Sequence, residues 1–258
     1  MKDRFKSQYG PWAIVTGASS GLGETFGDKL AQLGLNIVLV ARRKKRLEDN
    51  ANQLIKRHQV DCRVVCADLS KDNFIDLILK KTEDLPIGLL VNNAGAGQFG
   101  DFVDTPLTRE LEILHLNCRA PLILTHTFAR QMRSRKKGGI IFVSSIGGFL
   151  GISRMSHYAA TKAYDLLFAE GLYHELRRYN IDVLALCPGI TKTEFQKKAN
   201  VRQFLPMSPD VVVEKTLKKL GKTSIIVPGK LNQLTCALIK SLPRAWGSKA
   251  TDFGGKFF

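Results

Sequence analysis

The sequence has few cysteines, and none has the spacing of a metal site or a disulfide framework. Such sites place cysteines in pairs at short, regular intervals, whereas the five cysteines of this chain are scattered. Cys118 and Cys187 lie among apolar residues, which is typical of core thiols. We therefore expect no metal site, and thiols that stay reduced in the cytoplasm.

A long apolar segment is also lacking. No run approaches the roughly 18 residues that a membrane-spanning helix requires, and the stretch before Pro11 contains no apolar signal core. Export is therefore not expected, which again favours the cytoplasm. A chain of 258 residues fits one α/β domain with a large core.

Acidic residues are scarce beside basic ones. The chain has 23 aspartates and glutamates against 39 lysines and arginines, which gives a net charge of +16. Basic residues cluster at 42–46 and at 133–137. No zinc finger, RNP aromatic pattern or basic helix joined to heptads accompanies them, so we expect no nucleic-acid binding. The second cluster follows a predicted helix, where cations complement the helix dipole.

Near its start the sequence has the pattern of a strand, a glycine-rich turn and a helix. Residues 12–15 are apolar, the turn reads TGASSGLG at 16–23, and apolar residues then repeat at helical spacing as far as Gly34. Glycines allow close backbone approach to a pyrophosphate, and a helix N-terminus supplies free N–H groups. The spacing differs from the commoner Gly-x-Gly-x-x-Gly, but its context predicts a dinucleotide site.

Further apolar segments alternate with helical patterns along the chain. We expect strands at 36–40, 63–67, 89–91, 140–143, 182–187 and 224–227. A helix is expected from about Ser70. This alternation predicts the α/β class, with a doubly wound parallel sheet of about seven strands and helices on both faces. Ligands of such sheets bind beyond the carboxyl ends of the strands, where the polar motifs of this chain lie.

The residues at the end of the second predicted strand indicate which cofactor, NAD or NADP, the site would bind. A site selective for NAD places an acidic residue about 20 residues after the glycines, but this chain has Ala41, Arg42 and Arg43 there. Guanidinium groups suit the 2′-phosphate of NADP. The other interpretation is the solvated start of a helix.

Tyr158 and Lys162 stand four residues apart in a predicted helix and therefore share one face. A close cation favours the phenolate form of a tyrosine. Ser144 and Ser145 end the preceding strand and can bind an oxygen in the same pocket. The alternative is an exposed tyrosine with an ordinary partner one turn away.

As a set, these motifs resemble the short-chain dehydrogenase/reductase family over roughly residues 10 to 200. They are the 16–23 turn, Asn92–Gly95, Asn117, Ser145 and Tyr158-x-x-x-Lys162. The resemblance implies a Rossmann-type dinucleotide-binding domain over residues 1–258.

The same resemblance assigns roles in catalysis. Tyr158 is the general acid for carbonyl reduction and the general base for alcohol oxidation. Lys162 lowers the pKa of Tyr158 and holds the nicotinamide ribose, and Ser145 polarises the substrate. Asn117 distorts its helix and anchors a water that relays protons. The role of Ser144 stays open.

The resemblance also implies a set of residues that bind NADP(H). Asp68 contacts the adenine, Asn92–Gly95 line the adenosine ribose, and Thr191 and Thr193 face the nicotinamide and phosphates. Whether Arg42, Arg43 or both hold the 2′-phosphate is left open. The full set is Gly17, Ser19, Ser20, Gly21, Leu22, Gly23, Arg42, Arg43, Asp68, Leu69, Asn92, Ala94, Gly95, Tyr158, Lys162, Pro188, Gly189, Thr191 and Thr193.

Within the family, the motifs at 9–13, 96–100 and 226–229 resemble hydroxysteroid-dehydrogenase-like members and long-chain 3-ketoacyl reductases. This implies an NADPH-dependent oxidoreductase that reduces a ketone or aldehyde, or oxidises the alcohol, on a fairly hydrophobic substrate. One alternative is a 3-oxoacyl reductase acting on an acyl-carrier protein or acyl-CoA. The other is an NADP-binding sensor or scaffold without turnover.

The chain continues beyond residue 228 with an amphipathic stretch. From Lys230 to Trp246, leucines repeat on one helical face with basic residues nearby. We expect this extension to cover the substrate side, and a weak contact with a membrane surface is the minority interpretation. The family resemblance implies a homodimer or homotetramer through the helices near 107–132 and 157–179.

Overall fold

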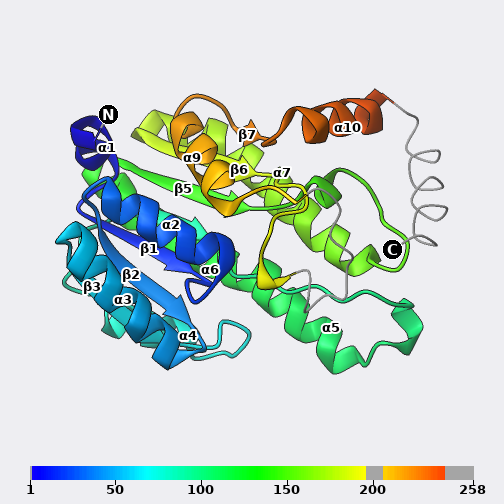
Figure 1. The fold of residues 1–258 in the computed structure, drawn as a ribbon, viewed down its shortest axis with the longest axis horizontal. Helices are drawn as coiled ribbons and strands as arrows, with labels where there is room; N and C mark the ends of the chain where they lie inside the picture. The colour runs from blue at the N-terminus through cyan, green and yellow to red at the C-terminus, as the bar shows by residue number, and fades with distance from the viewer. Residues whose placement is uncertain (1, 196–205, 242–258) are drawn as a thin grey trace.

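The protein is described here from a computed structural model, which covers residues 2–195 and 206–241. Its centre is a parallel sheet with the strand order β3-β2-β1-β4-β5-β6-β7 (Figure 1). Every neighbouring pair of strands is parallel. The strands are β1 (Trp12–Thr16), β2 (Asn36–Ala41), β3 (Cys62–Cys66), β4 (Ile87–Asn92), β5 (Gly138–Val143), β6 (Ile181–Leu186) and β7 (Ile225–Ile226). The predicted fold class is confirmed.

The central strands are apolar because helices cover both faces of the sheet. Every residue of β1, β4 and β5 is buried, as expected for parallel strands between two helical layers. One hydrophobic cluster joins the sheet to α2, α3 and α9, and a second joins it to α4, α6 and α7. The helices are α1 (Lys2–Tyr9), α2 (Gly21–Gln32), α3 (Lys44–His58), α4 (Phe74–Lys80), α5 (Leu107–Leu114), α6 (Ala120–Arg135), α7 (Ser156–Leu176), α9 (Pro209–Lys219) and α10 (Lys230–Ser241).

The strand order reverses at β1, which has β2 on one side and β4 on the other. In an open parallel sheet the chain then leaves neighbouring strands toward opposite faces, and a crevice opens at their carboxyl ends. Thr16, the last residue of β1, joins the end of this strand to the segment that follows β4. Its hydroxyl accepts hydrogen bonds from the backbone of Asn93 (2.9 Å) and Ala94 (3.0 Å). The candidate site lies along this edge.

Two helices differ from the sequence prediction. The helix expected from about Ser70 begins at Phe74, because Asp68 accepts hydrogen bonds from both the backbone and the hydroxyl of Ser70 and holds a turn. The long helix expected over 107–132 is interrupted by a π-helical turn at His115–Arg119.

Helix α10 forms only part of the amphipathic stretch that the sequence predicts. It contains Lys230–Ser241, and the remaining residues, 242–246, lie outside the described part of the chain. Within residues 2–195 and 206–241, no helix is long and apolar enough to cross a membrane.

Candidate active site

The glycine-rich turn brings the start of α2 close to the end of β1. A methyl group at Gly23 would lie 2.3 Å from the carbonyl oxygen of Gly17, so only glycine allows this approach. The Ser20 hydroxyl accepts a hydrogen bond from Arg43 at 2.6 Å rather than capping α2. The first N–H groups of α2 thus keep their capacity to bind a phosphate, as a pyrophosphate site requires.

Arg43 crosses from the end of β2 to the glycine-rich turn. Its guanidinium donates to the Ser19 hydroxyl at 3.1 Å and to the Ser20 hydroxyl at 2.6 Å. It also donates to Glu194 at 2.9 Å, and Arg46 donates to the same carboxylate at 2.6 Å. Hydrogen bonds from Arg46 and Arg43 lower the pKa of Glu194 to about 2. Three distant segments therefore meet around one guanidinium.

Arg42 points elsewhere. Its side chain is 71% exposed, and its guanidinium lies 3.8 Å from the carboxylate of Asp68. The two arginines that the sequence leaves equivalent thus have different surroundings, and only Arg43 is held against the glycine-rich turn.

Tyr158 lies near the start of α7, beyond the carboxyl end of β5. Its phenol forms a hydrogen bond with Ser145, and its ring lies against Phe195, with ring centroids 5.7 Å apart. A methyl group at Gly97 would come within 3.0 Å of the Tyr158 ring and 3.3 Å of the Phe195 ring. A larger residue at position 97 would therefore displace the tyrosine.

Lys162 lies one turn further along α7 and is buried. Its ammonium donates to the carbonyl oxygen of Val143 at 2.8 Å and to the carboxylate of Asp165 at 3.0 Å. Ser144 donates to the backbone carbonyl of Lys162 at 2.7 Å. Ser144 therefore ties α7 to the end of β5, which gives this serine a structural role.

Asn117 lies in the π-helical turn, where the wider turn accommodates an inward polar side chain. Its amide donates to the Ala96 carbonyl at 2.8 Å and to the Thr161 hydroxyl at 2.9 Å, and its oxygen accepts from the backbone of Ala96 at 2.9 Å. The family resemblance implies a helix distortion at Asn117, and the structure has one there.

Burial raises the pKa of the Tyr158 phenol, and the opposing effects of Lys162 and Ser145 do not reverse it. Lys162 acts to lower this pKa, as the sequence led us to expect, but burial outweighs its effect. Asp165 also acts to raise the pKa of Tyr158. Burial disfavours the charged form of Lys162, yet the Asp165 carboxylate raises the pKa of the ammonium overall.

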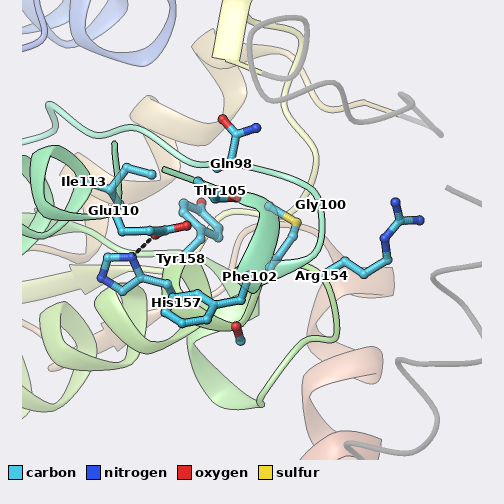
Figure 2. Close-up of a pocket in the computed structure, with 11 residues that line it drawn as sticks. Gln98, Gly100, Phe102, Thr105, Glu110, Ile113, Arg154, His157 and Tyr158 are labelled. Atoms are coloured by element: carbon cyan, nitrogen blue, oxygen red, sulfur yellow. Dashed lines mark hydrogen bonds and ion pairs between the residues drawn. The ribbon is translucent and has the colours of Figure 1, made fainter. Parts of the chain in front are cut away.

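A pocket opens beside Tyr158 (Figure 2). Its walls come from the 98–105 segment, from α5 and from the chain just before α7. On one side His157 contacts the buried carboxylate of Glu110, and Arg154 lies at the opposite end. The lining residues are Gln98, Gly100, Phe102, Thr105, Glu110, Ile113, Arg154, Met155, Ser156, His157 and Tyr158.

The remaining predicted residues lie along the same edge of the sheet. Thr193 contacts the start of α2, since a methyl group at Gly21 would meet its side chain at 3.0 Å. Thr191 is buried and donates to the Gly189 carbonyl at 3.0 Å. Asn92, Ala94, Gly95 and Pro188 directly follow or end β4 and β6, and Asp68 and Leu69 follow β3.

Several residues around the site were not anticipated from the sequence. Asp165 and Glu194 pair with predicted cations, and Glu110 pairs with His157 in the pocket wall. Asp165 could have been found, because it lies three residues after Lys162 on a helix. Glu194 gave no comparable signal, since its partners are far away in the chain.

Comparison with known proteins identifies the family of this chain. The family model described as short chain dehydrogenase matches residues 11–203. A structure from work on 7β-hydroxysteroid dehydrogenase stereoselectivity has a TM-score of 0.90, with 26% identity over 96% of this chain and 99% of that chain. A Sphingobium yanoikuyae short-chain dehydrogenase in complex with NADPH has a TM-score of 0.80, with 31% identity over 91% of this chain and 97% of that chain.

A human very-long-chain 3-oxoacyl-CoA reductase is 28% identical over 238 residues, which are 91% of this chain and 76% of that protein. Taken with the family model, these matches place the chain in the short-chain dehydrogenase family. It is an oxidoreductase of a family that uses NAD or NADP as the hydride carrier.

Proposed function

We propose that the protein uses NADPH to reduce a ketone or aldehyde on a fairly hydrophobic substrate, with Tyr158 as the general acid. The observation that carries this proposal is the position of Tyr158. Its phenol interacts with both Ser145 and Lys162, it lies beyond the carboxyl end of β5, and it is one of the residues that line the pocket.

Each residue then has a defined task. When bound, the nicotinamide supplies the hydride to the carbonyl carbon. Tyr158 donates its proton to the carbonyl oxygen as negative charge develops there, and Ser145 donates a hydrogen bond to that oxygen. Lys162 stabilises the phenolate that remains. In alcohol oxidation the phenolate form of Tyr158 would accept the proton of the alcohol.

We propose that Arg43, Ser19 and Ser20 form the pocket for the 2′-phosphate. The position of Arg43 supports this, since it is held against the turn that binds the pyrophosphate. Ala41 provides no carboxylate for a ribose hydroxyl, which also supports NADPH. Arg42, on the rim, contributes less.

The test compares kcat/KM for NADPH and NADH with a panel of carbonyl substrates. We expect the unmodified enzyme to prefer NADPH, and Arg43→Ala to reduce this preference by roughly 10- to 100-fold, the scale of one charge-assisted hydrogen bond. Arg42→Ala should cost less, and Ala41→Asp should shift the preference toward NADH. Arg57→Ala, which removes an exposed cation from the far end of α3, is the matched control. Equal use of NADH by the unmodified enzyme would refute the cofactor assignment.

The apolar side chains of Phe102, Ile113 and Met155 in the pocket wall support a partly hydrophobic substrate, and polar side chains line the rest of the pocket. We propose that the extension from about residue 228 helps to cover this side. In support, Lys240 lies over the Phe149 ring at 4.5 Å. The 3-oxoacyl-CoA reductase among the relatives favours acyl thioesters as the second candidate. Turnover of 3-oxoacyl-CoA or its carrier-protein ester, but not of free cyclic ketones, would favour that candidate.

The five cysteines are all free thiols. This supports our proposal that the protein works in the reducing environment of the cytoplasm.

A further inference from the structure

A buried carboxylate stands directly behind the proposed acid–base pair. Asp165 lies three residues after Lys162 on α7, and its Oδ2 is 3.0 Å from the ammonium. The two side chains are only 4% and 6% exposed. The second oxygen of Asp165 is buried and has no hydrogen-bond partner among residues 2–195 and 206–241.

Stability does not explain why this site holds an ion pair rather than two apolar residues. Removing two charges from water costs more than their attraction usually returns, and apolar residues of similar volume often stabilise a protein as well or better. The neighbouring Leu166 and Ala169 are buried apolar residues, so the carboxylate at position 165 is there to pair with Lys162, whose buried ammonium would otherwise lack an opposite charge within the described part of the chain. The carboxylate therefore calls for a functional explanation through Lys162.

The hydrogen bonds of Lys162 suggest that explanation. Two of its three N–H donors are committed, one to Val143 and one to Asp165. Among the described residues these are the acceptors of Lys162, which leaves the third donor for the nicotinamide ribose or the Tyr158 phenol. In addition, a carboxylate at 3.0 Å offsets part of the positive charge that Lys162 presents to Tyr158.

We propose that Asp165 is a positioning residue of the acid–base unit, which holds the Lys162 ammonium and offsets part of its charge, so that Asp165 acts together with burial to favour the protonated phenol of Tyr158. This proposal rests on the proposed function, and it deepens it, because a phenol is the form that donates the proton in carbonyl reduction. The structure thus favours an enzyme that keeps its reductive form well above neutral pH.

The other titratable groups around the unit do not provide the same charge. Burial raises the pKa of Cys118, on the π-helical turn, to about 11. Burial also raises the pKa of Tyr164 on α7. Both are therefore neutral near pH 7. Within the described residues, Asp165 is the group that opposes the effect of Lys162 on Tyr158.

The first test is the pH dependence of kcat/KM in both directions. Reduction falls at high pH as Tyr158 loses its proton, and oxidation rises over the same range. Asp165→Asn removes the charge and should move both limbs to lower pH by about one unit, the scale of one neighbouring charge. Asp165→Ser also lacks the charge and should move both limbs by the same amount. Because serine packs differently from asparagine, equal shifts would mean that the lost charge, and not altered packing, is the cause. Asp165→Glu should restore the original profile.

A matched control is available at the opposite end of the sheet. Asp182, at the start of β6, accepts a hydrogen bond from the Tyr9 phenol at 2.6 Å. Asp182→Asn makes the same chemical change beside another tyrosine, and it should leave the pH profile unchanged. A shift of similar size in this variant would mean that the effect is not specific to Asp165.

The second test needs neither cofactor nor turnover. The chain has five tyrosines, so phenolate absorbance is titrated with and without Tyr158→Phe, and the difference isolates Tyr158. In the Asp165→Asn background, the phenolate absorbance of Tyr158 obtained from this difference should rise at a lower pH. The same pH in both backgrounds would overturn the role of Asp165. Failure of the unmodified enzyme to reduce any carbonyl with NADPH would instead overturn the proposed function.

Discussion

Tyr158 is the residue on which the proposed chemistry depends most. Tyr158→Phe removes the proton donor but keeps the ring contact with Phe195. We expect kcat to fall by at least about 10²-fold, the usual scale for the loss of a general acid. The dissociation constant for NADPH, measured by calorimetry, should stay nearly unchanged. Tyr173→Phe on the same helix is the control, and turnover at the parent rate by Tyr158→Phe would contradict the mechanism.

Single residues also show where sequence reasoning reaches its limit. Tyr158, Lys162 and Ser145 were predictable, because their types and spacing carry the chemistry. The raised pKa of Tyr158 was not, because it depends on burial and on Asp165 as well as on Lys162. The different surroundings of Arg42 and Arg43 were also hidden, since they arise from contacts with Ser19, Ser20 and Glu194.

At the scale of elements, the contact between β1 and α2 determines the shape of the glycine-rich turn. Gly23→Ala would place a methyl group 2.3 Å from the Gly17 oxygen. We expect it to destabilise the protein by about 1–3 kcal/mol, as overpacking does, and to weaken NADPH binding. Urea unfolding measures the first effect.

Gly171→Ala is the matched control for this prediction. Gly171 lies within α7, and a methyl group there would meet no described atom within 4 Å. This variant should gain about 0.5–1 kcal/mol, because alanine is the better helix former. If Gly23→Ala were equally stabilising, the close approach of α2 to β1 would be wrong.

Helix α10 presents an apolar face to solvent. Leu231, Leu234 and Leu238 are 61%, 57% and 57% exposed, and Lys230 and Lys240 lie on the same helix. With a net charge of +16, this face suits a weak contact with an anionic lipid surface. We expect sedimentation with phosphatidylserine vesicles but not with neutral ones.

Leu234→Glu should reduce the binding to vesicles. Leu77→Glu, an exposed leucine of α4, is the control and should not. If the two variants bind phosphatidylserine vesicles equally well, the apolar face of α10 is not the lipid-binding surface. A change of molecular mass in Leu234→Glu would indicate contact with a second copy instead.

The position of the strands was predictable because parallel strands are buried on both faces and therefore form short apolar runs. The boundaries of the helices were harder to predict from the sequence. The turn held by Asp68 delays α4, and the π-helical turn divides α5 from α6. Both features depend on side-chain hydrogen bonds that hydrophobic periodicity does not report.

For the whole molecule, exposed leucines suggest how copies associate. Leu111 and Leu114 of α5, Leu122 of α6 and Leu167 of α7 are between 40% and 67% exposed. Exposed leucines that gather into one patch mark protein interfaces, and a symmetric pair of copies would cover those of both. We expect light scattering to show a dimer or tetramer.

Leu167→Glu should shift that equilibrium toward the monomer by placing like charges at the interface. Ile55→Glu on α3, where the parent residue is 45% exposed, should leave the molecular mass unchanged. A monomeric parent protein at micromolar concentration would contradict the predicted assembly.

The ion pairs of Glu194 with Arg43 and Arg46 place a competing carboxylate at the proposed 2′-phosphate pocket. A carboxylate tethered to the chain has a high effective concentration at these guanidiniums, and an arriving phosphate dianion must displace it. Exchange of the coenzyme should therefore be gated by this contact. In stopped-flow experiments, Glu194→Gln should bind NADPH faster than the parent, whereas the association rate of NADH, which lacks the phosphate, should change little. The segment after β6 would then limit how fast one turnover can follow another.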